Sequence, residues 1–70
     1  ISFTLPEDGF VVLEVYDALG AKTDVIYNGY ALGGILYEIN IDASMWSMGV
    51  YYTRLIVDDS VKIKRIVKSK

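Results

Sequence analysis

Residues 49–58 constrain the fold of this 70-residue chain more than any other stretch. Gly49 is followed by Val-Tyr-Tyr-Thr-Arg-Leu-Ile-Val-Asp, which places bulky side chains at nearly every position. Successive side chains of a β-strand point to opposite faces, so both faces of an extended segment here would be bulky. Such a strand needs neighbouring strands on both sides and cover on at least one face. The sequence therefore predicts a central strand of a β-sheet.

Five other stretches have the alternation of short strands. Together with 49–58, the expected strands are residues 1–5, 10–17, 22–27, 35–42 and 61–67. The alternation is clearest in 35–42, where every second residue is isoleucine or tyrosine, and in 10–17, where Val11, Leu13 and Val15 share one face. The alternation is broken in residues 61–67, and a β-bulge near Lys64 and Arg65 would restore it.

Proline, glycine and aspartate separate these stretches. Pro6 presets φ for a turn, and Gly9, Gly20 and Gly49 are expected to supply backbone freedom at turns, with a positive φ expected at Gly9 and Gly20. Asn28-Gly29 predicts a turn that ends the third strand. These glycines are interpreted as structural residues.

The connection before the central strand has two features of its own. Asp42-Ala43-Ser44 suits an Asx turn or a single helical turn, because the aspartate side chain can accept hydrogen bonds from the amides that follow. Trp46 is expected to plug one end of the core. Asp58-Asp59-Ser60 is expected to be the last hairpin turn.

Six short strands, with turn signals between them and no helix of useful length, predict an all-β antiparallel sandwich. Residues 1–70 are expected to form a single domain, and the apolar share of 53% is typical of a folded module. A core this small supports ~3–5 kcal/mol of stability. The chain begins within an alternating pattern and is expected to be part of a larger protein.

The residue types present argue against catalysis. The chain has no cysteine and no histidine, so thiolate chemistry and the usual general base and metal ligand are missing, and the serines have no histidine to activate them. The paired acids Glu7-Asp8 and Asp58-Asp59 fall in expected turns, where solvated carboxylates are normal. We expect no enzyme, no cofactor and no metal site. Without a long apolar run, we also expect no membrane insertion.

Charge is divided unevenly along the chain. Residues 1–59 hold nine acids and two bases, a net charge of −7. Residues 60–70 hold five bases and no acid, a net charge of +5, and these bases are Lys62, Lys64, Arg65, Lys68 and Lys70. A basic end on an acidic body favours a surface that faces a partner. Lysines on an edge strand also discourage sheet-to-sheet aggregation, and the sequence leaves both interpretations open.

Several segments resemble a known family when they are taken in order. They are Leu5-Pro6-Glu7-x-Gly9, Val11-x-Leu13-x-Val15-Tyr16-Asp17-x-x-Gly20, Ile39-x-Ile41-Asp42-Ala43-Ser44, Gly49-Val50-Tyr51-Tyr52-x-Arg54-Leu55 and Lys64-x-Ile66-Val67-x-x-Lys70. In this order and spacing the chain resembles the C-terminal type A sorting domain of the type IX secretion system of Bacteroidota, close to the immunoglobulin-like domain of hook-capping proteins. The resemblance covers nearly all 70 residues.

The resemblance implies an immunoglobulin-like sandwich of six to seven strands. This module would direct export of an upstream cargo domain through the periplasm, and attachment of the cargo to the cell surface or its release into the medium. The implied partners are the outer-membrane translocon and a sortase-like peptidase. The five basic residues of the end are then the candidates for recognition by the translocon. Two departures stand out: the family's usual first strand around a Pro-Asn-Pro motif has no counterpart, and Trp46 stands where leucine is common.

The alternative is a structural or carbohydrate-binding immunoglobulin-like accessory domain of a secreted enzyme. A sugar platform would need exposed aromatic side chains on one surface, and its candidates are Tyr27, Tyr30, Trp46 and Tyr52. Nucleic acid is not expected as a partner, because the body is acidic and the tyrosines alternate as core residues do.

Overall fold

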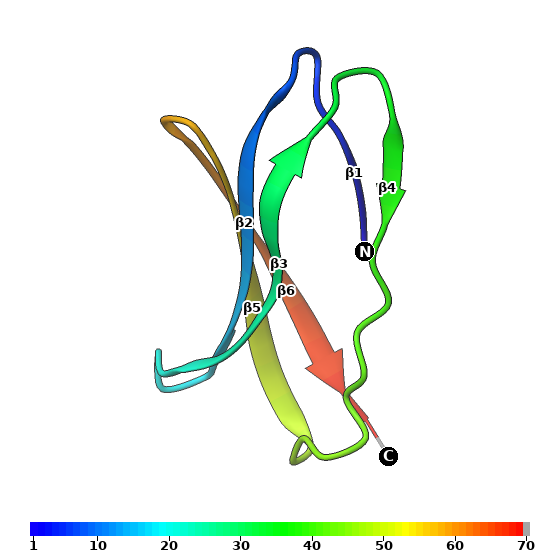
Figure 1. The fold of residues 1–70 in the computed structure, drawn as a ribbon. Helices are drawn as coiled ribbons and strands as arrows, with labels where there is room; N and C mark the ends of the chain where they lie inside the picture. The colour runs from blue at the N-terminus through cyan, green and yellow to red at the C-terminus, as the bar shows by residue number, and fades with distance from the viewer. Residues whose placement is uncertain (70) are drawn as a thin grey trace.

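A computed structural model describes residues 1–69, so Lys70 lies outside the described residues. The described chain is all-β, with no helix, and its strands are β1 (Ser2–Thr4), β2 (Gly9–Asp17), β3 (Lys22–Ala31), β4 (Leu36–Glu38), β5 (Gly49–Val57) and β6 (Ser60–Lys68). They form two antiparallel sheets that pack together (Figure 1). The predicted antiparallel β-sandwich of short strands is confirmed. Within residues 1–69, no helix is long and apolar enough to span a membrane.

The larger sheet has the strand order β3-β2-β5-β6, and the smaller sheet contains only β1 and β4. Residues 49–57 therefore lie in a strand with a neighbour on each side, as the bulk of their side chains predicted. In Figure 1 the smaller sheet stands across one face of the larger one, which we call the inner face. The opposite, outer face of the larger sheet has no second layer within the described chain.

The centre of the core is one face of β2. Val11, Leu13 and Val15 have exposed fractions of 0%, 1% and 0%, as their alternation predicted. Phe3 and Leu5 from β1 and its turn pack onto this face together with Ala31 at the end of β3. Burying these apolar side chains between two sheets is the main source of stability.

Three aromatic rings connect the layers. Phe3 stacks on Tyr37 with ring centroids 5.2 Å apart, and the edge of Tyr27 meets Phe3 at 5.6 Å and Tyr37 at 6.0 Å. Offset and edge-to-face pairs add stabilisation beyond the area they bury. Because Phe3 belongs to β1, Tyr37 to β4 and Tyr27 to β3, the rings place the smaller sheet over the β3–β2 side of the larger one.

The predicted turn at Asn28-Gly29 is wrong. β3 continues through both residues to Ala31, with Asn28 opposite Val12 and Gly29 opposite Val11. β2 offers a full row of backbone partners along this length, and pairing with it outweighs the local turn preference of the dipeptide. The pairing of β2 with β3 has two register shifts, one between Leu13 and Glu14 and one between Val15 and Tyr16 of β2.

The strand expected over residues 35–42 is much shorter. β4 covers only Leu36–Glu38, although the predicted alternation is kept, with Tyr37, Ile39 and Ile41 half-buried. Its partner β1 has three residues, and the ladder extends by one more pair in which Ile1 and Ile39 exchange backbone hydrogen bonds of 2.7 and 3.0 Å. Beyond Ile39 the described chain supplies no further partner strand.

The predicted bulge near Lys64 and Arg65 is also wrong. β6 pairs with β5 residue for residue from Ser60 opposite Val57 to Lys68 opposite Gly49. The slip in alternation is tolerated because β6 is an edge strand that the smaller sheet does not cover, so both of its faces are largely exposed. Because neither face of β6 belongs to the core, its sequence does not need a continuous alternation of apolar residues.

The turns agree with the sequence in part. Gly20 has a φ of 87° and Gly49 a φ of 145°, values that favour glycine. Gly9 is a buried residue at the start of β2 without a positive φ, so the turn conformation expected of it is wrong, while Pro6 does lie in the β1–β2 turn. Asp58 carries a φ of 51° in the two-residue β5–β6 turn.

The connection into β5 has an Asx turn, one of the two conformations expected for residues 42–44. The Asp42 Oδ1 atom accepts a hydrogen bond of 3.1 Å from the Ser44 amide. Trp46 lies half-buried with its ring centroid 4.5 Å from that of the buried Tyr51. Trp46 thus covers the start of β5, in agreement with the plug that was predicted.

We predict that Leu13→Ala unfolds most of the protein. A leucine truncated in a packed core loses ~2–5 kcal/mol of the free energy of unfolding, which is comparable to the total of ~3–5 kcal/mol expected for a core of this size. Urea denaturation followed by circular dichroism measures the change. Leu19→Ala is the control, because Leu19 is 95% exposed and its removal should leave the midpoint unchanged. A Leu13→Ala protein as stable as the wild type would contradict this account of the core.

Candidate functional site

The predicted basic residues lie on β6. Lys62, Lys64 and Arg65 are exposed and Lys68 is half-buried, whereas Lys70 lies outside the described residues. β6 is the last strand of the larger sheet, so the backbone groups along its far edge have no partner strand in residues 1–69. None of these four side chains forms an ion pair within the described part of the chain.

The four basic residues do not form one patch. Lys62 pairs with Leu55 and Lys64 with Thr53, so both lie on the inner face of the sheet, as does Lys68 opposite Gly49. Arg65 lies one step out of phase, opposite Tyr52, and faces the outer side. The basic end therefore presents an inner row of three lysines and a separate arginine.

Lys68 is near the Asx turn that precedes β5. Hydrogen bonds from the Ser44 side chain and amide lower the pKa of the Asp42 carboxyl, and the positive charge of Lys68 contributes in the same direction. The charge of Lys68 at the end of β6 therefore acts on the Asp42 carboxyl of the Asx turn.

A groove of about 530 Å³ lies beside the inner row of lysines. Its walls are β1 with the following turn on one side and β6 on the other, and its floor is β5. The lining residues are Ser2, Phe3, Thr4, Leu5, Pro6, Glu7, Asp8, Leu55, Val57, Asp58, Ser60 and Lys62. The groove exists because the smaller sheet lies over the β3–β2 side and leaves Leu55 and Val57 at the end of β5, together with the inner face of β6, partly open.

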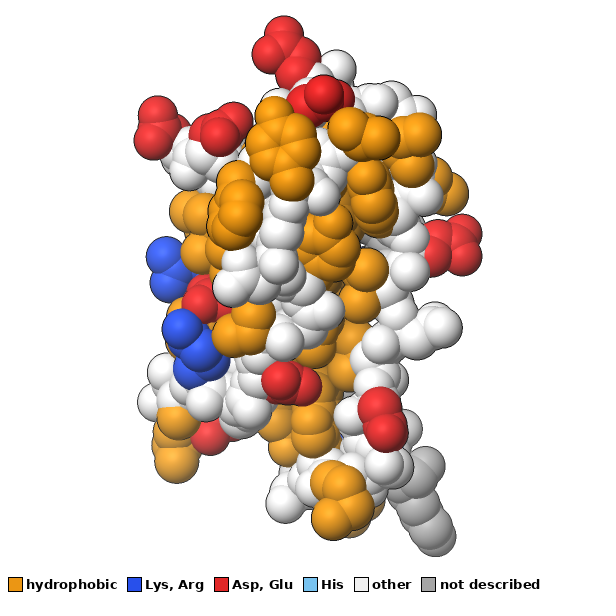
Figure 2. All heavy atoms as spheres, in the orientation of Figure 1, with side chains coloured by type: hydrophobic (Ala, Val, Ile, Leu, Met, Phe, Trp, Pro, Cys, Tyr) orange, Lys and Arg blue, Asp and Glu red, His pale blue; other side chains and the backbone are white. Residues whose placement is uncertain are grey.

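The groove has opposite charges at different places. Lys62 lies along the β6 side, while Glu7, Asp8 and Asp58 gather at the end formed by the β1–β2 and β5–β6 turns. Figure 2 shows acidic side chains clustered at this end of the molecule. Asp8 also holds the turn in place, because its Oδ1 atom accepts a 2.7 Å hydrogen bond from the amide of Gly33.

Gly33 is needed for that contact. A Cβ atom at this position would lie 2.7 Å from the Cα atom of Glu7, closer than side chains approach backbone. The β3–β4 connection therefore packs directly on the β1–β2 turn and fixes the acidic end of the groove. No feature of the sequence pattern had singled out this glycine.

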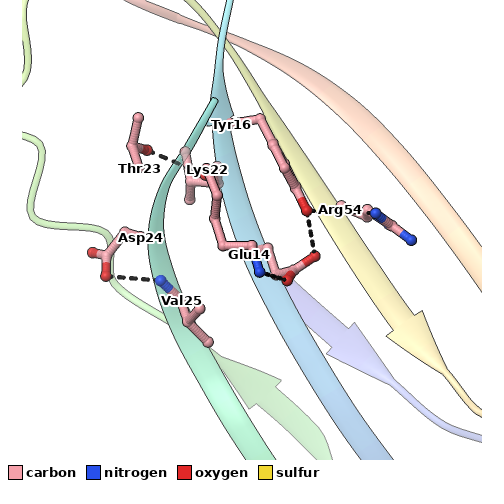
Figure 3. Close-up of polar contacts among 8 residues, drawn as sticks. Glu14, Tyr16, Lys22, Thr23, Asp24, Val25 and Arg54 are labelled. Carbon is pink, nitrogen blue, oxygen red and sulfur yellow. Dashed lines mark hydrogen bonds and ion pairs between the residues drawn. The ribbon is translucent and has the colours of Figure 1, made fainter. Parts of the chain in front are cut away.

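A second polar feature lies on the outer face of the larger sheet. Glu14 is 6% exposed, and its Oε2 atom lies 2.8 Å from the Lys22 Nζ atom, while its Oε1 atom accepts a 2.9 Å hydrogen bond from the Tyr16 hydroxyl (Figure 3). Arg54 donates to the Tyr16 hydroxyl at 3.4 Å. The four side chains come from three adjacent strands and form one connected group.

This group is a structural feature of the sheet. The hydrogen bond from Lys22 lowers the pKa of Glu14 most, burial opposes that effect, and Tyr16 and the charges of Lys22 and Arg54 lower the pKa further. The same contact with Glu14 raises the pKa of Lys22. Sequence analysis missed the group, although a single glutamate between Leu13 and Val15 in an apolar strand is a signal that the side chain needs a partner.

The aromatic residues proposed as a sugar platform are not brought together. Tyr27 belongs to the inner aromatic cluster, and Trp46 packs on Tyr51, also an inner residue. Tyr30 pairs with Phe10 and Tyr52 with Tyr16, which places both on the outer face. With two of these side chains on each face, the interpretation as a single carbohydrate platform is wrong.

Comparisons with known proteins do not assign a family. No family model, no curated protein and no solved structure matches the chain. Across residues 1–69, no group of three or more acidic side chains lies close enough together to hold a metal ion.

We predict that the Glu14 group stabilises the protein in a pH-dependent way. Glu14→Gln should lower the free energy of unfolding by about 1 kcal/mol at pH 7, since a buried carboxylate loses charge-assisted hydrogen bonds. The pKa of Glu14 is lowered in the folded state, so its contribution is present above the pKa of the unfolded chain and disappears as the pH falls through the folded value. The wild type and the variant should therefore converge as the pH falls below the folded-state pKa of Glu14.

Urea midpoints measured from pH 3 to pH 7 test this. Glu38→Gln is the matched control, because Glu38 is exposed and forms no ion pair in the described chain. A difference between wild type and Glu14→Gln that stays constant over this range would show that the carboxylate charge does not matter.

Proposed function

We propose that this chain is a non-catalytic C-terminal sorting module that directs export of a larger protein through the type IX secretion system. The proposal takes its function from the sequence resemblance. The observation that supports it is β6, an exposed edge strand that carries Lys62, Lys64, Arg65 and Lys68 on an otherwise acidic body. In this proposal the outer-membrane translocon recognises the chain through these four residues.

The physical basis is recognition of a folded surface. The four basic side chains have no acidic partner within residues 1–69, so their charge is available to another molecule. Complementary charges increase the rate of encounter and fix orientation, and salt screens them because the side chains are exposed. Binding to the translocon should therefore weaken as the ionic strength rises.

The free edge of β6 adds a second means of recognition. An unpaired strand edge offers backbone donors and acceptors to a partner strand, and lysines along it prevent indiscriminate pairing. In this proposal the module is carried at the end of its cargo, passes through the periplasm, and is processed by a sortase-like peptidase at the outer membrane. A further domain following Lys70 in the same polypeptide would contradict it.

Export of a fused reporter tests the function. We expect a periplasmic reporter that carries this chain at its C-terminus to reach the medium or the cell surface of a type IX-competent host. Replacing Lys62, Lys64, Arg65 and Lys68 by glutamine should reduce the exported fraction at least about tenfold, the factor for a loss of ~1.4 kcal/mol shared among four exposed charges.

Two controls separate recognition from folding. Glu38→Gln removes an exposed charge that lies outside β6 and forms no ion pair in the described chain, so it should leave export unchanged. Thermal unfolding of the purified glutamine variant should match the wild type, because three of the four side chains are exposed and the fourth is half-buried. If a reporter fused to the wild-type chain stays in the periplasm, the proposed export function is wrong. If the folded glutamine variant is exported as well as the wild type, the basic residues of β6 are not the recognition site.

A further inference from the structure

The outer face of the larger sheet carries a broad apolar surface. Six of its side chains are between 37% and 67% exposed, and they are Phe10, Tyr30, Tyr52, Val61, Ile63 and Val67. Half-buried Val12 and Ile56 lie among them in the middle of the sheet. No second layer covers this face within residues 1–69. Contiguous apolar surface of this kind on a protein marks a place where another molecule binds.

A shallow hollow of about 420 Å³ lies on the same face. It is lined by Tyr16, Tyr52, Arg54 and Ile63, which come from three adjacent strands. Figure 3 shows Tyr16 and Arg54 of this set, joined by the hydrogen bond to the Tyr16 hydroxyl. The hollow has room for a large apolar side chain such as leucine or phenylalanine. Apolar anchors seated in such pockets supply most of the binding energy of protein interfaces.

The backbone of the sheet limits what can bind to this face. The strands pair with one another in the plane of the sheet, so the face offers side chains and no backbone groups. A partner must therefore satisfy its own backbone hydrogen bonds, and a helix does so within one short segment. Helices commonly form the second layer on a sheet.

The dimensions of the face suit one helix. β2, β5 and β6 have nine residues each, which at ~3.3 Å per residue gives a length of about 30 Å. A helix of about 20 residues has the same length, and its width of ~10 Å covers about two strands.

Charge selects the composition of the helix. Among the paired residues of the four strands, the outer face has three cations, Lys22, Arg54 and Arg65. Its one carboxylate, Glu14, is buried and already bound to Lys22. Arg65 is exposed, lies on the edge strand opposite Tyr52, and has no ion-pair partner in residues 1–69.

Arg65 and the hollow project from the same face, so one partner reaches both. A helix whose apolar stripe lies over the hollow has one flank of that stripe beside β6. A carboxylate on this flank would pair with Arg65, whereas a lysine there would be repelled. A second copy of the chain packed face to face would bring these cations together with no carboxylate to pair them.

We propose that the outer face of the larger sheet binds an amphipathic helix of another protein, with an apolar side chain in the hollow and carboxylates along the flank that faces β6. The inference does not depend on the export function, because it concerns binding by the purified chain.

Two synthetic helical peptides of about 18 residues test the composition. Both carry one stripe of leucines at helical spacing. The first has glutamates along one flank of the stripe, and its matched control has lysines at the same positions. We expect the purified 70-residue chain to bind the control at least about tenfold more weakly than the glutamate peptide, measured by fluorescence anisotropy at low salt. The helicity of the glutamate peptide, measured by circular dichroism, should rise on binding.

Paired variants of the chain test the surface. Arg65→Glu should abolish or reverse the preference between the peptides, whereas Lys64→Glu makes the same charge change on the inner face and should keep the preference. Ile63→Ser should weaken binding of the glutamate peptide about tenfold. Leu36→Ser is its control, because Leu36 is 60% exposed on the smaller sheet and Ile63 is 67% exposed. Urea midpoints close to that of the wild type confirm that the variants are folded.

Isoleucine methyl signals in NMR spectra of the wild-type chain locate the bound peptide. Saturation with the glutamate peptide should shift the signals of Ile56 and Ile63 on the outer face and leave those of Ile39 and Ile66 unchanged. Each of four results would overturn the proposal. They are equal binding of both peptides, shifts at Ile39 or Ile66 in place of Ile56 and Ile63, a bound peptide that is not helical, and self-association of the chain through the outer face.

Discussion

The pairing of β2 with β5 is the interaction on which the rest of the structure depends. These strands align over seven residue pairs from Val11–Val57 to Asp17–Tyr51, and each has a further partner on its other side. Their central position satisfies the backbone of both strands and lets β2 bury Val11, Leu13 and Val15 completely. Within residues 1–69, β3 pairs with β2 alone and β6 with β5 alone, and the smaller sheet packs on the inner face of this sheet.

The two layers are unequal in size, and this inequality produces the surfaces available for function. Two short strands cannot cover a sheet of four longer ones, so the aromatic contacts among Phe3, Tyr27 and Tyr37 draw the smaller sheet to the β3–β2 side. The inner face stays open at Leu55, Val57 and β6, and the outward edge of β1 has no partner strand within residues 1–69. A groove follows directly, with Leu55 and Val57 as its apolar floor, Lys62 on the β6 side and acidic side chains at one end.

Charges serve different purposes on the two faces of the larger sheet. On the outer face Glu14 is enclosed by Lys22, Tyr16 and Arg54, so the charges neutralise one another and hold three strands together. On β6 the lysines have no such partners within the described chain. The physical difference is burial: a carboxylate that loses water must be paired, whereas exposed ammonium groups remain solvated and available to another molecule.

The sequence by itself determined the all-β class, the central place of residues 49–57, the inward row of β2 and the basic character of the last strand, because alternation and local charge are properties of neighbouring residues. Only the tertiary structure decided that β3 runs through Asn28-Gly29, that β4 stops at Glu38, that β6 needs no bulge and that the basic residues divide between two faces. Those outcomes, like the Glu14 group and the groove, depend on which strand lies alongside and how far it extends. Pairing between distant segments satisfies backbone groups and buries surface, and the local sequence pattern does not show which segments will pair.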